Sequence, residues 1–278
     1  MEHFYLIANS QKEGTRQAAA DIASYVRSRG GTCAGGIPEN GRNVAPSQVP
    51  EETECVITLG GDGTLIQAAR DLVDLELPLI GVNMGHLGYL TQVSRSESVI
   101  PMLDSLLEDR YCVERRMMLE GRVEGPSGVR TGIALNDIVL TRKDVLQVLN
   151  FQVYLNRAYF NEYNADGIIA CTPTGSTAYN LSAGGPIVAP GAELMVLTPI
   201  CSHSLNSRSI VLSAEDEVSL RPLDLVQKAQ TAVFDGDQVL EIEPGGTLEI
   251  RRAQKYTRLI QLNSAPFLEN LRNKMARI

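Results

Sequence analysis

A glycine-rich turn, residues 60–64, combines one carboxylate with backbone that can approach an anion closely. The apolar run 55–59 before it predicts a buried strand, and residues 65–70 after it suit a helix. A strand-to-helix turn presents free N–H groups and the positive end of a helix to a group such as phosphate. Asp62 would repel phosphate, so the sequence predicts that it faces a metal, a hydroxyl or an amide. The structural alternative is a turn in which Asp62 or Thr64 caps the helix.

A second candidate site lies in residues 164–186, which are rich in hydroxyl groups. The apolar run 167–171 predicts a strand, and it leads through Thr-Pro-Thr-Gly-Ser-Thr into a helical turn that starts near Thr177. Hydroxyls and N–H groups at a helix start can hold a ribose, an amide or a phosphate, although Ser and Thr also cap helices without any ligand. Tyr179 can stack on a base or a nicotinamide ring, or pack half-buried. The density of small residues favours a binding site.

Composition and charge narrow the class of protein. The chain has 278 residues, enough for about two domains, and 44% of them are hydrophobic. With 25 basic and 33 acidic residues its net charge is −8, which argues against binding to nucleic acid or to a membrane surface. No apolar run approaches the ~18 residues of a membrane span, and the start Met-Glu-His lacks the basic residues of a signal peptide.

The spacing of the cysteine and histidine residues indicates an intracellular protein and argues against a structural metal site. The 5 cysteines are scattered without C-x-x-C spacing, as expected of reduced thiols, and the 3 histidines form no metal-ligand spacing. We therefore expect a cytoplasmic protein without structural zinc.

Residues 1 to about 110 alternate between strand and helix patterns. Strands are predicted at 4–8, 55–59 and 78–83, and helices at 15–29 and 101–109. Residues 35–50, which contain three prolines, are expected to form a loop. This order predicts a Rossmann-like α/β domain with a doubly wound parallel sheet and a site at the carboxyl ends of its strands. The glycine turns 60–63 and 81–85 both fall at such ends.

The pattern changes after residue 111 to closely spaced strands. They are predicted at 111–123, 131–141, 148–160, 167–171, 210–212, 217–221, 231–234, 238–242 and 247–251. This spacing predicts a mostly antiparallel, β-sandwich-like domain. Residues 266–278 are helix-like and are expected to pack back on the first domain, because a lone helix of that length is unstable. The expected domains are 1–110 plus about 264–278, and 111–263.

Taken together, these motifs resemble those of the NAD kinases. The likeness rests on residues 60–64, 81–90, 135–137, 166–186, 198–205 and 235–236. The motifs occur in the family's order over roughly residues 55–240. The Gly-Gly-Asp-Gly-Thr motif alone is weak evidence for this family, since lipid kinases and phosphofructokinases carry similar turns. The block from Thr172 to Pro186, in company with Asn136-Asp137, is specific.

The resemblance implies transfer of the γ-phosphoryl group of ATP to the 2′-hydroxyl of the adenosine ribose of NAD, giving NADP. Asp62 would be the catalytic residue facing that hydroxyl, which explains an acid within a glycine turn. A free Asp has a pKa of about 3.9, so Asp62 would orient the hydroxyl and accept its proton late in the reaction. Glycine N–H groups and a Mg²⁺ ion, or another divalent metal, on the triphosphate would offset the charge on the transferring group.

The resemblance also implies which residues bind the substrates. Asn136 and Asp137 would hold the NAD adenosine or its ribose, and Asp166 would accept from the nicotinamide carboxamide or ribose. Further expected contacts are Asp62, Gly63, Thr174, Thr177, Ala178, Tyr179, Ser182 and Asp237 with NAD, and Gly60, Gly61, Gly63 and Thr64 with the phosphates of ATP. The structural alternatives are a strand-end turn at Asn136 and an Asx-turn at Asp166. The resemblance also implies self-association, and antiparallel β domains offer edges that can pair, so a homodimer or homotetramer is expected.

The chain departs from the family pattern at a few positions. Many members have Asp-Gly-Gln where this chain has Asp-Gly-Asp-Gln at 235–238, so either Asp237 or Gln238 takes the substrate contact. Asn164 stands where a basic residue is frequent, and Arg208 is followed by Ser rather than the usual Pro.

Two other classes of function stay open. A lipid or sugar kinase could carry the same glycine turn, but it leaves residues 174–182 unexplained. A non-catalytic NAD(H)-binding sensor would need a disabled Asp62 or metal site, and Asp62 is intact. The sequence does not distinguish ATP from polyphosphate as the phosphoryl donor, or NAD from NADH as the acceptor.

Overall fold

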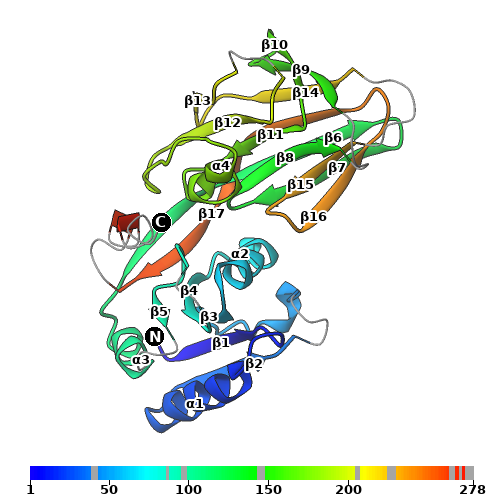
Figure 1. Ribbon diagram of the computed structural model, residues 1–278. Helices are drawn as coiled ribbons and strands as arrows, with labels where there is room; N and C mark the ends of the chain where they lie inside the picture. Colours follow the sequence, from blue (N-terminus) through cyan, green and yellow to red (C-terminus); the bar gives the residue numbers. More distant parts are fainter. Residues whose placement is uncertain are drawn as a thin grey trace. The chain divides into compact units, whose positions relative to one another are not determined.

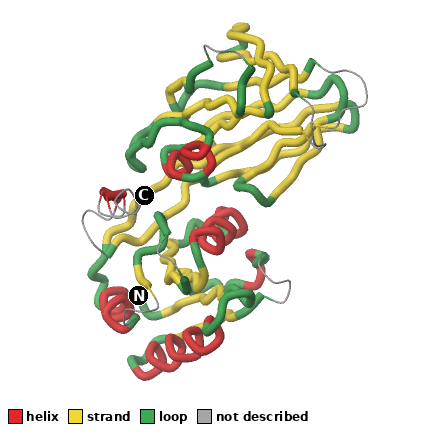
Figure 2. The backbone as a smooth tube through the Cα atoms, viewed as in Figure 1, coloured by secondary structure: helices red, strands yellow, loops and turns green. Residues whose placement is uncertain are grey.

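The structure, a computed structural model, divides into two compact units (Figure 1). The described residues are 1–38, 43–85, 88–94, 99–142, 148–203, 207–223, 230–262, 267–268 and 271–272. Unit 1 comprises residues 1–116 and 255–278, and unit 2 comprises residues 117–254. Figure 2 shows most helices in unit 1 and mainly strands in unit 2. The limits expected from the sequence, 110/111 and 263/264, stay predictions about independently folding domains.

Unit 1 is built on a parallel sheet in the order β2-β1-β3-β4. Its strands are β1 (His3–Ala8), β2 (Thr32–Gly36), β3 (Cys55–Gly60), β4 (Pro78–Asn83) and the short β5 (Val93–Ser94). The last part of β17 (Thr247–Gln261) runs parallel to β4 through Arg258 and Leu259. The predicted parallel sheet is confirmed, and β3 is buried along its whole length, as expected of a strand covered on both faces.

Helices cover both faces of this sheet (Figure 1). α1 (Thr15–Ser28) and α3 (Ile100–Leu107) lie on one face, and α2 (Asp62–Asp71) lies on the other. Two short 3-10 turns, Pro46–Gln48 and Val73–Leu75, occur in the connections.

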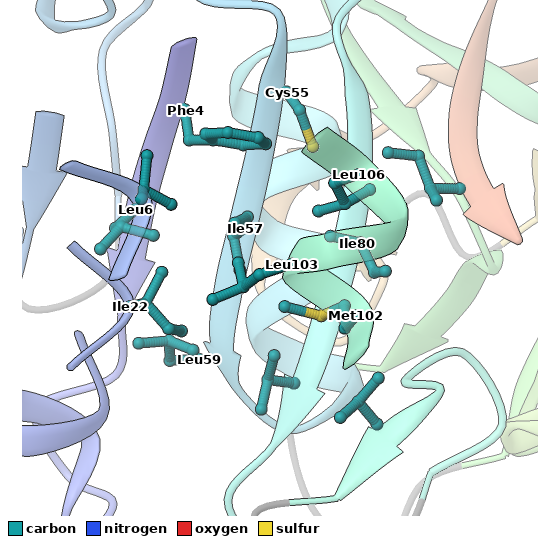
Figure 3. Close-up of a cluster of buried hydrophobic side chains, with 14 of the residues drawn as sticks. Phe4, Leu6, Ile22, Cys55, Ile57, Leu59, Ile80, Met102, Leu103 and Leu106 are labelled. Carbon is teal, nitrogen blue, oxygen red and sulfur yellow. The ribbon is translucent and has the colours of Figure 1, made fainter. Parts of the chain in front are cut away.

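The core under α1 and α3 is made from alternate strand positions (Figure 3). Successive side chains of a strand point to opposite faces, so β3 directs Cys55, Ile57 and Leu59 into this core. α1 contributes Ile22 and α3 contributes Leu103, both with 0% exposure. Burial of this apolar surface holds the helices on the sheet and so fixes where β3 and β4 end.

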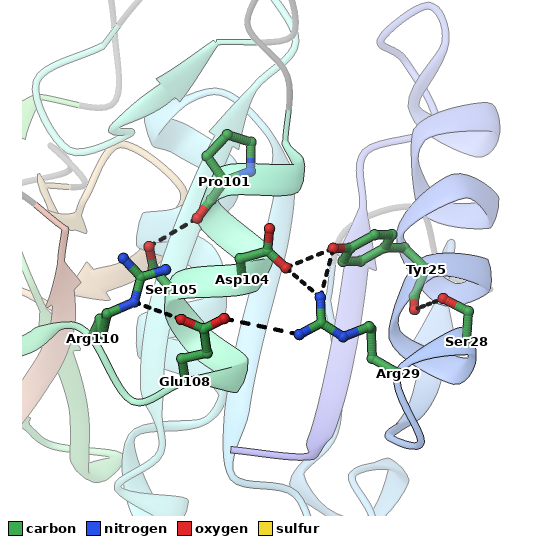
Figure 4. A network of polar contacts seen from close by, with 8 residues as sticks. All are labelled: Tyr25, Ser28, Arg29, Pro101, Asp104, Ser105, Glu108 and Arg110. Atoms are coloured by element: carbon green, nitrogen blue, oxygen red, sulfur yellow. Dashed lines mark hydrogen bonds and ion pairs between the residues drawn. The ribbon is translucent and has the colours of Figure 1, made fainter.

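A polar network joins α1 to α3 beside this core (Figure 4). The Tyr25 hydroxyl donates to Asp104 Oδ1 at 2.6 Å, and Arg29 Nη1 donates to the same oxygen at 2.7 Å. These contacts lower the pKa of the Asp104 carboxyl, with the Tyr25 hydrogen bond as the largest cause. Glu108 lies between Arg29 and Arg110 at 3.9 and 2.8 Å. Because solvent screens such pairs, the network orients the two helices more than it stabilises them.

Unit 2 is a sandwich of two mainly antiparallel sheets. The first has the order β10-β9-β14-β17, with β6 beside β17 and β7 beside β6, and the second has the order β13-β12-β11-β8-β15-β16. The strands are β6 (Cys112–Gly125), β7 (Gly128–Ala134), β8 (Asp137–Arg142), β9 (Leu149–Leu155), β10 (Ala158–Ala165), β11 (Gly167–Cys171), β12 (Leu194–Ile200), β13 (Ile210–Ser213), β14 (Val218–Pro222), β15 (Gln230–Phe234) and β16 (Gln238–Ile242). A 3-10 turn (Thr174–Thr177) and α4 (Tyr179–Ser182) follow β11. The predicted antiparallel sandwich is confirmed.

Two predicted strands are each divided in the structure. The run 131–141 breaks where β7 ends and β8 begins, and Asn136 lies at the break. The run 148–160 becomes β9 and β10, joined by a two-residue turn. A hydrophobic pattern does not show such breaks, because a turn or a side-chain hydrogen bond interrupts the ladder without changing the alternation.

Other elements differ from the prediction in length or were missed. β2 and β12 were not predicted, since a Gly-Gly pair and a proline obscure their patterns. β17 has 15 residues and extends well beyond the predicted 247–251. The helix expected at 266–278 lies largely outside the described residues, so its packing stays a prediction.

The buried position of Leu103 gives a test of the unit 1 core. Leu103→Ala removes a fully buried side chain between α3 and the sheet. We expect the free energy of unfolding to fall by about 2–5 kcal/mol, the range for such cavities. Denaturant unfolding of both proteins measures it, and a change below about 1 kcal/mol would contradict this packing.

Candidate functional site

Asp62 is the first residue of α2, and the segment after β4 fixes its carboxylate. The N–H groups of Leu90 and Thr91 donate to Oδ1 at 3.2 and 3.1 Å, and the Tyr89 N–H donates to Oδ2 at 2.6 Å. A side chain at Gly88 would overlap the carboxylate, so only glycine permits this approach. The acid of the glycine turn is therefore held by backbone at the carboxyl ends of β3 and β4.

Thr91 connects this carboxylate to the end of β4. Its side chain is 1% exposed, and its hydroxyl lies 3.1 Å from Asp62 Oδ1, toward which it donates. The Thr91 hydroxyl oxygen itself accepts from Asn83 Nδ2 at 3.0 Å and from the Gly88 N–H at 3.2 Å. Asn83 Oδ1 in turn accepts from the Gly85 N–H at 2.7 Å. One buried hydroxyl thus ties together Asp62 and both ends of the 83–91 segment.

Packing requires glycine at one position of the turn 60–64 but not at two others. A side chain at Gly60 would overlap Thr64, so internal packing requires glycine there. A side chain at Gly61 or Gly63 would meet open space, and neither residue has a positive φ, so packing does not require glycine at either position. Gly61 is the N-cap of α2 and no side chain caps the helix, so the capping role considered for Asp62 or Thr64 is wrong.

In unit 2, Asp235 holds the backbone at the break between β7 and β8. Its carboxylate accepts from the N–H groups of Leu135 at 2.9 Å, Asn136 at 2.7 Å and Asp137 at 3.2 Å. The Asp235 N–H donates back to the Asp137 carbonyl at 3.0 Å. Asp235 has a φ of 50°, a conformation that Asp tolerates better than most residues. This carboxylate replaces the ladder partners that the broken strand lacks.

The hydroxyl-rich turn packs against the same backbone. The Thr172 hydroxyl donates to the Leu135 carbonyl at 2.6 Å, and the Thr172 N–H donates to the Asn136 carbonyl at 2.8 Å. The Gly175 N–H donates to the Thr172 hydroxyl at 3.1 Å, and a side chain at Gly175 would overlap the Asn136 backbone. Tertiary structure thus brings together two motifs that are 36 residues apart, from 136 to 172.

A cavity of about 360 Å³ lies at this junction within unit 2. It is lined by Asn136, Asp137, Val139, Thr141, Ala178, Tyr179, Val233, Asp235 and Gly236. Asn136 Oδ1 is buried and has no hydrogen-bond partner in the described chain. Leaving a buried acceptor unpaired costs free energy, and functional sites are where such atoms occur. The cavity therefore offers an acceptor to a ligand that carries a donor, with the 46% exposed Tyr179 at its wall.

Asp137 is the titratable group most altered by this environment. It is 5% exposed, and its pKa rises from 3.8 to about 7, first because burial disfavours the charged form and second because the Asp235 carboxylate lies nearby. Since Asp235 accepts three N–H groups in its charged form, Asp137 is the acid that takes up the proton. Charge in this cavity consequently changes near neutral pH.

The other residues expected to bind NAD lie in varied surroundings. Thr174 is buried, Thr177 makes only a long hydrogen bond of 3.4 Å to the Thr174 carbonyl, and Ser182 is exposed. None of these three lines the Asn136 cavity. Ala178 and Tyr179 do line it, so the structure gathers two members of the 174–182 segment there.

Asp166 and Asp237 also lie outside that cavity. Asp166 Oδ1 pairs with Arg142 Nη1 at 2.6 Å, so one of its oxygens already has a cationic partner. Asp237 and Gln238 are exposed at the turn between β15 and β16.

Sequence reasoning missed three residues that shape these sites: Thr91, Asp235 as a holder of backbone, and Arg142. Thr91 and Arg142 carry no local signal, because only the tertiary fold brings them to Asp62 and Asp166. Asp235 had a signal in its Asp-Gly turn, but its partners lie about 100 residues away.

Two protein-family models match this chain. A model of the ATP-NAD kinase N-terminal domain matches residues 5–111, and a model of the ATP-NAD kinase C-terminal domain matches residues 135–262. The chain belongs to the NAD kinase family. The NAD kinase of Lachnospira eligens is 42% identical over 294 residues, 99% of this chain and 100% of that protein. The NAD kinase of Agathobacter rectalis is 43% identical over 99% of both chains.

Solved structures share the fold across both units. Yeast NADH kinase complexed with NADH aligns with a TM-score of 0.87 at 21% identity, over 99% of this chain and 88% of the other. An NAD kinase from Archaeoglobus fulgidus in complex with ATP aligns with a TM-score of 0.79 at 20% identity, over 99% of both chains. At these identities the likeness establishes the fold.

The described residues contain neither a cluster of metal-binding side chains nor a membrane-spanning helix. No group of three or more His, Cys, Asp or Glu side chains within the described ranges is placed to hold a metal ion. No helix among those residues is long and apolar enough to cross a membrane. Residues 86–87 of the motif 81–90 lie outside the described residues.

The raised pKa of Asp137 predicts a pH-dependent stability. Asp137 titrates near 3.8 in the unfolded chain and near 7 in the folded one. Its contribution to folding stability is therefore fully present below about pH 3.8 and is lost as the pH rises through about 7. Asp137→Asn removes the titration and should gain stability over wild type at pH 8 relative to pH 5, by up to about 3 kcal/mol, since about two pH units at about 1.36 kcal/mol each separate pH 5 from the folded pKa. Unfolding free energies of both proteins at the two pH values measure this difference. An equal difference at both would contradict the assignment.

Proposed function

We propose that this member of the NAD kinase family transfers the γ-phosphoryl group of ATP to the 2′-hydroxyl of the adenosine ribose of NAD, giving NADP, with Asp62 as the catalytic residue. The observation that carries this assignment is the fixed Asp62 carboxylate, with four donors from residues 89–91, in a chain matched by both NAD kinase domain models. A carboxylate held in this way needs little reorganisation during reaction.

The two oxygens of Asp62 differ in what they can still accept. Oδ1 accepts from the Leu90 N–H, the Thr91 N–H and the Thr91 hydroxyl, which exhausts its capacity. Among the described residues Oδ2 accepts only from the Tyr89 N–H, so one lone pair stays available. We therefore assign Oδ2 as the atom that accepts the hydrogen bond of the ribose 2′-hydroxyl.

This geometry suits a late proton transfer. Phosphoryl transfer passes through a loose transition state, in which the attacking hydroxyl keeps its proton until bond formation is advanced. Asp62 Oδ2 then aligns the hydroxyl oxygen with the phosphorus and takes the proton as the new P–O bond forms and the bond to the β-phosphate oxygen breaks.

Residues of unit 2 supply the NAD contacts in this proposal. Asn136 Oδ1 accepts from an amino or hydroxyl group of the adenosine, which satisfies its unpaired lone pairs. Tyr179 and Ala178 form a wall of the same cavity, where the ring can stack on a base. Asp137 and Asp166 offer acceptors to ribose or carboxamide donors. We assign Thr174, Thr177, Ser182 and Asp237 to the periphery of the NAD site. That the yeast NADH kinase was solved in complex with NADH is consistent with a dinucleotide substrate.

The glycine turn of unit 1 supplies the contact with ATP. The open space at Gly61 and Gly63 leaves room for phosphate oxygens beside the N–H groups at the start of α2, with Gly60 and Thr64 shaping the turn. The ATP complex of the Archaeoglobus relative supports this donor. Because the described residues form no metal cage, we propose that Mg²⁺ enters bound to ATP as part of the substrate, where it neutralises phosphate charge.

The proposal also covers the oligomeric state of the protein and its location in the cell. We expect a homodimer or homotetramer, formed through exposed strand edges such as β10, β13 and β16. We also expect a cytoplasmic location, supported by five free cysteines, of which Cys55 and Cys171 are buried with raised pKa values.

The decisive experiment compares wild type with Asp62→Asn. Purified protein is incubated with NAD, Mg²⁺ and either ATP or polyphosphate, and NADP is read by a coupled dehydrogenase. We expect NADP from wild type and a loss of at least ~100-fold in the variant, because an amide cannot take the proton. Circular dichroism and NAD binding control for folding, since the amide also meets the N–H donors of residues 89–91.

Each other outcome points to a different conclusion. Near-normal turnover by Asp62→Asn would remove Asp62 from the mechanism. Wild-type protein that binds NAD but forms no NADP with either donor would favour the sensor reading. Folded protein that does not bind NAD would favour a lipid or sugar kinase.

Thr91 gives a second prediction, because it holds Asp62 without facing a substrate in this proposal. Thr91→Val keeps the shape but removes the hydroxyl that joins Asp62, Asn83 and Gly88. We expect kcat for NADP formation to fall by about 10-fold, as for a loosened catalytic group, with the KM for NAD little changed. Thr91→Ser restores the hydroxyl and should recover most of the rate. Equal rates in the valine and serine variants would refute this role.

A further inference from the structure

A second cavity in unit 2, of about 370 Å³, lies on the sheet formed by β9, β14, β17 and β6. It shares no lining residue with the Asn136 cavity, and nothing in the proposed reaction uses it. Strand alternation turns Val218 and Ile250 into the sandwich core, where both are 0% exposed, and turns their neighbours to the outer face. The cavity is therefore a feature of the solvent-facing side of this sheet.

The hollow is centred on a small side chain between longer ones. Ser219 pairs with Tyr154 on one neighbouring strand and with Glu249 on the other. Side chains opposite one another on a sheet face are close neighbours, so a serine between two long residues leaves a depression. Within the described chain the Ser219 hydroxyl has no hydrogen-bond partner. The floor of the cavity thus carries an available donor.

Four arginines line this cavity, and two of them are neutralised by carboxylates. Arg122 pairs with Glu249 at 3.0 Å, and Arg251 pairs with Glu120 at 2.7 Å. Such pairs hold their side chains in place and leave little net charge. The electrostatic character of the site consequently depends on the other two arginines.

Arg221 and Arg157 have no carboxylate partner among the described residues. The Arg221 guanidinium carbon lies 4.3 Å from the centre of the Tyr154 ring, a stacked cation–π arrangement. A stacked guanidinium keeps the N–H groups on its edge free, and these match a phosphate or carboxylate in a bidentate way. Glu217 also lines the cavity, so the lining totals four arginines and three glutamates.

The backbone at Arg157 is unusual for an arginine. Asn156 and Arg157 form the two-residue turn between β9 and β10, with φ values of 51° and 69°. Glycine is the usual second residue of such turns, because a Cβ is disfavoured there. Asn156 is anchored to the β14 side by hydrogen bonds of 2.7 Å to Asp216 and 2.9 Å from the Glu217 N–H. A costly conformation, fixed by its neighbour, delivers a guanidinium to the cavity.

We propose that this cavity binds a small molecule through a phosphate group, held by Arg157, Arg221 and Ser219. Three groups with available donors line one hollow, and the lining carries a net positive charge in a chain whose net charge is −8. A volume of about 370 Å³ is within the range of small-molecule sites, so it admits a phosphate with a short organic group. Free phosphate and a phosphate ester share this chemistry.

Two variants remove the proposed contacts with little risk to folding. Arg157→Gly places the preferred residue in a strained turn, and Arg221→Gln keeps a long polar side chain on an exposed face. Arg27→Gln, on an exposed position of α1 in unit 1, is the control that changes net charge equally. All three should retain wild-type NADP formation, since none lies in the proposed catalytic or substrate-binding residues.

Isothermal titration calorimetry with inorganic phosphate and with glycerol 3-phosphate, at constant ionic strength set with chloride, tests the proposal. We expect saturable binding by wild type and by Arg27→Gln, and at least ~10-fold weaker binding by Arg157→Gly and by Arg221→Gln. Tighter binding of the ester would identify an organic phosphate as the ligand, and equal binding would identify phosphate alone.

Three results would overturn the proposal. Absence of saturable binding by wild type with either probe is one. Equal affinities in wild type and in the double variant that combines Arg157→Gly with Arg221→Gln is another. The third comes from sedimentation: if the double variant breaks up a wild-type oligomer while the phosphate affinity stays unchanged, a second copy of the chain covers this face instead.

Discussion

In each unit one aspartate accepts three consecutive backbone N–H groups, and the candidate sites depend on these two carboxylates. Asp62 accepts from residues 89–91, and Asp235 accepts from residues 135–137. Both segments lie where a strand ends and the ladder no longer supplies partners. Backbone N–H groups must be paired when buried, and bonds to a charged acceptor are the stronger kind. A carboxylate is therefore an effective way to fix irregular backbone at a site.

This arrangement explains features that would otherwise look unrelated. Glycine is required at 88 because the Asp62 carboxylate lies against its backbone, and at 175 because the Asn136 backbone does. The charge of Asp235 is one reason why the pKa of Asp137 rises, since two carboxylates near each other disfavour a second charge. The same hydrogen bonds leave Asp62 Oδ2 with spare capacity and Oδ1 with none. Structural support and chemical availability are thus divided between the two oxygens of one side chain.

The two units contribute in different physical ways. The parallel sheet of unit 1 directs the ends of β3 and β4 to one edge, so the loops that follow them meet. The antiparallel sandwich of unit 2 provides faces on which alternate residues point outward, and this produces both the Asn136 cavity and the charged hollow around Ser219. Neither cavity needs a special local sequence, because strand pairing assembles each one from residues far apart in the chain.

The amino-acid sequence by itself determined the fold class, the family and the importance of Asp62. Short apolar runs bounded by glycine and proline identified most strands, because burial of both sheet faces leaves a clear local pattern. The limits of several strands, the break at Asn136 and the strands β2 and β12 did not follow from that pattern, since hydrogen bonds from distant residues decide them. Only the tertiary structure showed that Thr91 and Asp235 hold the sites, that Arg142 pairs with Asp166, and that Arg157 and Arg221 share a cavity. Those contacts join residues of separate elements that are tens of residues apart in the chain, so no local sequence pattern encodes them.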